Sequence, residues 1–67
     1  MQIEINDEYI TLSQLLKVCN IVSSGGEAKA YLASETVLVN GEPDNRRGRK
    51  LRSGDSVETD GITINIK

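Results

Sequence analysis

The spacing of apolar residues changes twice along the chain, and this change limits the possible folds more than any other feature. Residues 2–5 (QIEI) alternate apolar and polar side chains, which is the period of a half-buried strand. In residues 12–19 (LSQLLKVC) the apolar side chains fall at positions i, i+3, i+4 and i+7, which form one stripe of a helix. Alternation returns in residues 62–66 (ITINI). The pattern predicts helices packed against a sheet.

Two segments carry the start signal of a helix. Thr11 with Gln14, and Ser24 with Glu27, have the spacing of a capping box. Residues 28–32 then supply a short apolar stripe for the second helix. We therefore expect two short helices joined by a tight connection.

After the helices the signals are those of strands and hairpin turns. Residues 36–42 (TVLVNGE) are rich in β-branched side chains, and the dipeptides Asn40-Gly41 and Asp60-Gly61 favour two-residue hairpins. The predicted order is one strand, two helices and four strands. This is an α+β fold in which two short N-terminal helices pack on one small, mostly antiparallel sheet, in a single domain spanning residues 1–67.

The composition excludes several classes of function. The chain has no His and one Cys, so it lacks the ligands of a zinc site, the partner for a disulfide and the usual general base. Cys19 is expected to be a small buried apolar residue. No phosphate-binding glycine motif is present, and no catalytic residue, metal, cofactor or small-molecule substrate is predicted. No apolar run is long enough for a membrane span and no signal peptide is found, so we expect a cytoplasmic protein.

The aromatic residues are few. Tyr9 and Tyr31 are the only ones, which is too few for the base-stacking platforms of RNA-recognition motifs or single-strand-binding barrels.

Positive charge is concentrated in one short segment, although the chain has a formal net charge of −2. Residues 45–52 (NRRGRKLR) contain no acid and include five of the eight basic residues, namely Arg46, Arg47, Arg49, Lys50 and Arg52. Clustered like charges repel one another unless an anion offsets them, and the planar guanidinium group suits phosphate oxygens. The segment is either a solvated loop or a phosphate-binding loop.

Strand alternation assigns roles within this segment. If Leu51 points into the core, Lys50 and Arg52 project to solvent, whereas Arg49 shares the buried face with its stem packed and its head emerging. Residues 46–47 are expected at the loop tip.

Two further positions extend the predicted patch. Lys29, on the second helix, continues it if that helix lies beside the loop. The start of the same helix, at Gly25, offers free backbone N–H groups to a phosphate.

Residues 11–58 resemble the S-four RNA-binding domain, also called the alpha-L motif, of small stand-alone bacterial proteins. The resemblance rests on a Ser-rich turn, a helix with A-K-x-x-L, then V-x-V-N-G and later G-D-x-V. These motif positions are Ser24, Ala28, Lys29, Leu32, Val37, Val39, Asn40, Gly41, Gly54, Asp55 and Val57. Many members carry arginine where this chain has Thr11 and Gly25, which shifts the expected RNA contacts toward the later loop.

The resemblance implies a non-catalytic protein that docks on structured RNA, either ribosomal RNA or a tRNA-like fold, and a ribosomal subunit is among the implied partners. The implied RNA-binding residues are Lys17, Ser24, Gly25, Lys29, Asn40, Gly41, Arg46, Arg47, Arg49, Lys50 and Arg52, with Lys17 peripheral.

Two alternatives stay open. The opening MQIEINDEYITLSQLL also resembles the strand, strand and helix of small β-grasp proteins, which suggests a protein–protein interaction module. The chain ends in INIK rather than Gly-Gly, so carrier chemistry is excluded. The other alternative is a folded domain whose basic loop binds nothing specific.

Overall fold

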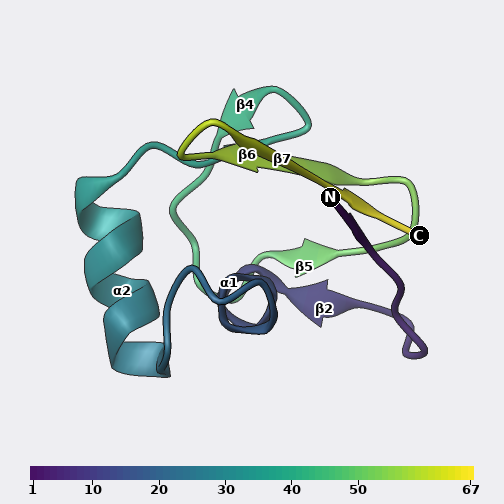
Figure 1. The fold of residues 1–67 in the computed structure, drawn as a ribbon, viewed down its shortest axis with the longest axis horizontal. Coiled ribbons are helices and arrows are strands. Elements are labelled where there is room, and N and C mark those ends of the chain that lie inside the picture. The colour runs from purple at the N-terminus through teal and green to yellow at the C-terminus, as the bar shows by residue number, and fades with distance from the viewer.

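Two helices from the N-terminal half pack against a sheet formed mainly by the C-terminal half (Figure 1). The structure, a computed structural model, describes all 67 residues. The elements in chain order are β1 (Gln2–Ile3), β2 (Ile10–Thr11), α1 (Leu12–Val18), α2 (Gly25–Ser34), β3 (Leu38–Val39), β4 (Glu42–Pro43), β5 (Lys50–Leu51), β6 (Ser56–Thr59) and β7 (Ile62–Ile66). The predicted α+β class is confirmed.

The main sheet has the strand order β1-β7-β6-β3-β4. All of its pairs are antiparallel except β1 with β7, which run parallel. The two hairpins turn at Asn40-Gly41, with φ of 52° and 85°, and at Asp60-Gly61, with φ of 51° and 72°. Positive φ at both central residues is the geometry of a type I′ turn, which explains the Asn-Gly and Asp-Gly dipeptides. Both turn predictions are confirmed.

The prediction of one sheet is wrong, because β5 belongs to a second, two-stranded sheet with β2. In this sheet Ile10 lies opposite Leu51 and Thr11 lies opposite Lys50. The predicted element order lacked β2, which follows a bend at residues 6–8. Its two residues are too short to show alternation, and they are held in place by a partner strand far along the chain.

The caps of the two helices follow the sequence signals with one difference. At α1 the Thr11 N–H donates to Gln14 Oε1 (2.9 Å) and the Gln14 N–H donates to Thr11 Oγ1 (3.2 Å), so this capping box is confirmed. At α2 the Glu27 N–H donates to Ser24 Oγ (3.1 Å). The Glu27 carboxylate, however, accepts from the backbone N–H and hydroxyl of Ser23 instead of from the Ser24 N–H. The prediction of a capping box at α2 is therefore half correct: the Ser24 hydrogen bond is present and the one to the Ser24 N–H is not.

One apolar cluster joins the helices to both sheets. Its members are Leu12, Leu15, Leu16, Val22, Ala28, Leu32, Val37, Val39, Leu51, Val57, Ile64 and Ile66. Cys19 packs against this core half-buried, and burial raises the pKa of its thiol. The raised pKa keeps the thiol protonated at neutral pH, as expected for a packing residue. Neither helix has the length and apolar character that crossing a membrane requires.

Candidate nucleic-acid interface

The basic loop, residues 45–52, is tied by its backbone to the start of α1. The Arg47 carbonyl accepts from the Ser13 N–H (3.1 Å) and the Arg49 carbonyl accepts from the Leu12 N–H (2.9 Å). The first N–H groups of a helix have no partner within the helix, so these bonds satisfy groups that would otherwise need water or a cap. A turn at Arg47-Gly48 is closed by the Arg49 N–H donating to the Arg46 carbonyl (3.1 Å). The backbone fixes the loop and leaves its side chains available.

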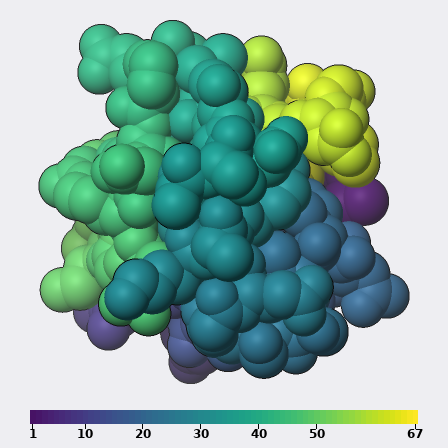
Figure 2. All heavy atoms as spheres, turned by 90° about the vertical axis from the view of Figure 1, so that its left-hand side faces the viewer, coloured from purple at the N-terminus to yellow at the C-terminus, as the bar shows by residue number.

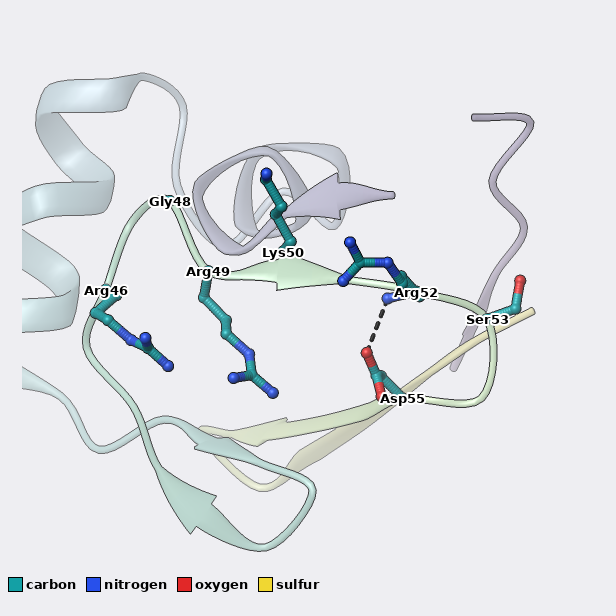
Figure 3. A pocket seen from close by; sticks show the side chains of 7 residues that line it. All are labelled: Arg46, Gly48, Arg49, Lys50, Arg52, Ser53 and Asp55. Carbon is teal, nitrogen blue, oxygen red and sulfur yellow. Dashed lines mark hydrogen bonds between the residues drawn. The ribbon is translucent and has the colours of Figure 1, made fainter. Parts of the chain in front are cut away.

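Four cationic side chains of this loop surround one hollow, which we call the polar hollow (Figure 3). Its lining contains no apolar side chain and consists of Arg46, Gly48, Arg49, Lys50, Arg52, Ser53 and Asp55. In Figure 3, the side chain of Arg49, just before β5, and that of Lys50, in β5, point to opposite sides of the chain. Leu51 between Lys50 and Arg52 is fully buried while both cations are exposed, so the predicted alternation is confirmed.

Asp44 neutralises part of this charge. Its carboxylate accepts from Arg46 Nε (3.1 Å), Arg46 Nη2 (2.7 Å) and the Arg46 backbone N–H (3.0 Å). The side-chain hydrogen bond from Arg46 is the main reason that the pKa of Asp44 lies below its usual value. No other acidic residue forms an ion pair within 4.0 Å, so Arg47, Lys50 and Arg52 have no carboxylate partner.

Arg49 is partly structural, as alternation predicts. Its side chain is 33% exposed, and its Nε lies 3.9 Å from Asp44 Oδ2. That Nε is buried and makes no hydrogen bond. The Arg49 stem is thus held beneath the loop, and only part of its guanidinium group reaches the surface.

The Asn40 side chain links the β3–β4 turn to the base of the polar hollow. Asn40 Nδ2 donates to Asp55 Oδ1 (3.1 Å), and the Ser56 N–H donates to Asn40 Oδ1 (2.9 Å). The other oxygen of Asp55 accepts from the Arg52 N–H (2.8 Å), which is the main cause of the lowered pKa of Asp55. The V-N-G and G-D-x-V motifs therefore interlock two turns and hold the backbone of Arg52.

The remaining predicted residues do not line the polar hollow. Lys17 lies in the last turn of α1, at the end away from the basic loop, and Gly41 lies in the β3–β4 turn. Ser24 caps α2, and the Glu27 carboxylate lies at the same helix start. Lys29 is exposed on α2. Both overall views place α2 (teal) beside the chain that leads into β5 (green), so the helix bearing Lys29 borders the loop (Figures 1 and 2).

One residue at this surface, Tyr9, was not predicted from the sequence. Lys50 Nζ lies 5.0 Å and Arg52 Cζ lies 6.0 Å from the centroid of its ring. The pairing of β2 with β5 brings these groups together. No local signal in the sequence indicates that pairing.

No group of three or more His, Cys, Asp or Glu side chains is placed to hold a metal ion.

The chain is thus a small α+β domain whose basic loop, fixed on the start of a helix, presents cations to an anionic partner. The S4 domain family matches residues 3–67, and the chain belongs to this family, as its motifs indicated. Among curated proteins, it is 58% identical over 60 residues to the probable ribosome maturation protein RlbA of Bacillus subtilis (strain 168). The aligned region covers 90% of this chain and 84% of that relative. Family membership supports an RNA-related role for the chain.

Proposed function

We propose that this chain is a single, non-catalytic domain, residues 1–67, that binds the phosphate backbone of structured RNA in the cytoplasm. Ribosomal RNA is the favoured target, because the similar Bacillus protein is named for ribosome maturation. On this proposal the protein associates with a ribosomal subunit or its precursor and positions itself by the shape of folded RNA.

The observation that supports this proposal is a set of cations that the protein itself does not neutralise. The side chains of Arg47, Lys50 and Arg52 form no ion pair. The loop backbone is held by α1 through the Arg47 and Arg49 carbonyls, and by Asp55 through the Arg52 N–H. A fixed backbone lowers the entropy lost when charged side chains bind a ligand. The protein has a net charge of −2, so attraction to a polyanion must come from this surface and not from overall charge.

We rank the proposed RNA contacts by whether each cationic side chain already has a carboxylate partner within the protein. Arg47, Lys50 and Arg52 bind phosphates directly, and Lys29 extends the surface onto α2. Arg46 and Arg49 contribute after rearranging around Asp44. Four other predicted positions support the surface without a proposed direct contact: Ser24, Gly25, Asn40 and Gly41. Lys17 lies outside the proposed contact set.

The salt dependence of binding tests this proposal. If about five phosphates are neutralised, the slope of log K against log salt should be roughly −3.5 to −4.5. A fourfold rise in salt should then weaken binding by about two to three decades. Fluorescence anisotropy with labelled fragments of ribosomal RNA measures this slope, and a slope near zero contradicts the proposal.

Charge reversal locates the contacts. Arg47→Glu combined with Arg52→Glu should reduce affinity by at least about tenfold and flatten the salt slope, because two phosphate contacts are lost and two repulsions are added. We avoid Arg46 here because its reversal would also break the ion pair with Asp44. Lys17→Glu is the control for the single variant Arg52→Glu, since each replaces one positive charge by one negative charge and Lys17 is exposed on a helix away from the hollow. Equal effects of Lys17→Glu and Arg52→Glu would show that binding responds to net charge alone.

A further inference from the structure

Tyr9 is an exposed aromatic side chain that plays no part in the core. It is 38% exposed, and its hydroxyl makes no hydrogen bond within the protein. The other tyrosine, Tyr31, is half-buried, and its hydroxyl lies 2.7 Å from Thr59 Oγ1. Because Thr59 Oγ1 donates to the Thr36 carbonyl (3.2 Å), the Tyr31 hydroxyl donates to Thr59. Tyr31 thus has a structural role and Tyr9 has no equivalent one.

The strand register places Tyr9 among cations. Ile10 lies opposite Leu51 and Thr11 lies opposite Lys50, so continuing the antiparallel ladder by one residue places Tyr9 opposite Arg52. Leu51 is fully buried, and side chains alternate between the faces of a strand. Tyr9, Lys50 and Arg52 therefore share the outer face of the small sheet. The two measured ring distances, 5.0 Å to Lys50 Nζ and 6.0 Å to Arg52 Cζ, agree with this arrangement.

We infer that Tyr9 stacks on one unpaired base of the bound RNA while Lys50 and Arg52 bind the phosphates that flank this base. The inference rests on the proposed function and adds a contact that phosphate binding alone does not supply. Stacking a base on an aromatic ring generally stabilises more than an exposed cation–π contact does. A base can therefore displace a flexible cation from the ring, and the displaced cation then reaches a neighbouring phosphate.

The residues around Tyr9 indicate on which side of its ring the base and the phosphates lie. On one side the ring borders a recess lined by Ile5, Ile10 and Val18, and Val18 is 61% exposed. Asp7 also lines this recess, and its carboxylate would repel a phosphate. The sugar–phosphate chain is therefore placed on the side of Lys50 and Arg52, and the uncharged base is directed toward this recess, whose lining is partly apolar.

Two RNA hairpins that differ in a single base test the inference. One carries a bulged adenosine, and the other carries an abasic ribonucleotide at the same position, so both have the same number of phosphates. Wild-type protein should bind the adenosine hairpin about 5- to 100-fold more tightly. Tyr9→Leu should bind the two hairpins equally, and Tyr9→Phe, which keeps the ring, should retain the preference. Circular dichroism confirms that each variant is folded.

Three results would overturn the inference, and they can be told apart. If wild-type protein binds both hairpins with equal affinity and a steep salt slope, base stacking is absent and the proposed function stands. If Tyr9→Leu weakens binding to both hairpins equally, the ring only positions Lys50 and Arg52. If wild-type protein binds neither these hairpins nor ribosomal RNA fragments, the proposed function fails and the inference fails with it.

Tyrosine fluorescence supplies a second readout, because the chain has two Tyr and no Trp. In the Tyr31→Phe variant, Tyr9 is the sole fluorophore. Stacking predicts that the adenosine hairpin quenches this emission more strongly than the abasic hairpin at equal occupancy. Equal quenching by the two hairpins contradicts stacking.

Discussion

Replacing Asp55 by alanine should loosen the support beneath the basic loop. The Asp55 carboxylate accepts two hydrogen bonds, from the Arg52 N–H at 2.8 Å and from Asn40 Nδ2 at 3.1 Å. Together they join the β3–β4 turn to the chain that leaves β5. Asp55→Ala removes both bonds and leaves the Arg52 N–H and the Asn40 amide to water.

The size of the effect follows from the number and exposure of these bonds. A hydrogen bond to a charged group contributes about 1.5–3 kcal/mol when buried, and water compensates part of this at a half-exposed site. Two such bonds give an expected loss of about 2–3 kcal/mol in the free energy of unfolding. Domains of this size have a stability of about 3–10 kcal/mol, and each kcal/mol corresponds to about 4–8 °C in Tm. Asp55→Ala should therefore lower Tm by at least about 8 °C.

Thermal and urea unfolding followed by circular dichroism measure this loss. Glu58→Ala is the matched control, because Glu58 is exposed on β6 and its carboxylate makes no hydrogen bond, so Tm should change little. Asn40→Gly removes the other side chain and suits the positive φ of 52° at that position. In a double-mutant cycle the two variants should show a coupling energy of about 0.5–1.5 kcal/mol. Equal Tm values for Asp55→Ala and Glu58→Ala would refute the reasoning.

Other predictions concern charge, pH and packing. Asp44→Asn should free the Arg46 guanidinium while keeping an oxygen for the Arg46 N–H, so RNA affinity should rise and the anisotropy salt slope should steepen by about 0.7–0.9. The pKa values of Asp44 and Asp55 are lowered in the folded state, so their contribution to stability is complete above the ordinary value of about 4 and is lost as pH falls through the lowered values. Acid unfolding followed by circular dichroism should show this loss of stability. The loss should be smaller in the variant that combines Asp44→Asn with Asp55→Asn. Leu51→Ala should cost about 2–5 kcal/mol in urea unfolding, because Leu51 is fully buried; a smaller loss would mean the site collapses around the cavity.

Local signals in the sequence predicted much of the fold. The capping box at Thr11 and the turns at Asn40-Gly41 and Asp60-Gly61 were predicted correctly, because each depends on neighbouring residues only. The burial of Leu51 between two exposed cations was also predicted, since alternation reports which face of a strand is covered. These signals describe an element and its faces but do not identify its partner.

Most of the errors and omissions involve a partner distant in sequence or a choice between several N–H donors, and one involves a local ion pair. The pairing of β2 with β5 joins residues about 40 positions apart, and it decides that Tyr9 meets Lys50 and Arg52. The Glu27 carboxylate had two N–H groups within reach and bonds to that of Ser23. The ion pair of Asp44 with Arg46 is local in sequence, and the turn-forming Asp-Asn pair beside the arginines was the signal that could have indicated it.

The backbone N–H groups at the starts of α1 and α2 could in principle bind an anion, but other groups of the protein already occupy these positions. The first N–H groups of α1 donate to the carbonyls of Arg47 and Arg49, so this helix start positions the basic loop and cannot also bind a phosphate. At α2, Ser24 takes one N–H group, and the Glu27 carboxylate places a negative charge where a phosphate would approach. The start of α1 is thus occupied, and the Glu27 carboxylate opposes an anion at the start of α2, so the cationic side chains must supply most of the attraction. Because each phosphate bound by such a side chain releases counterions, the measured salt slope should count the side chains engaged.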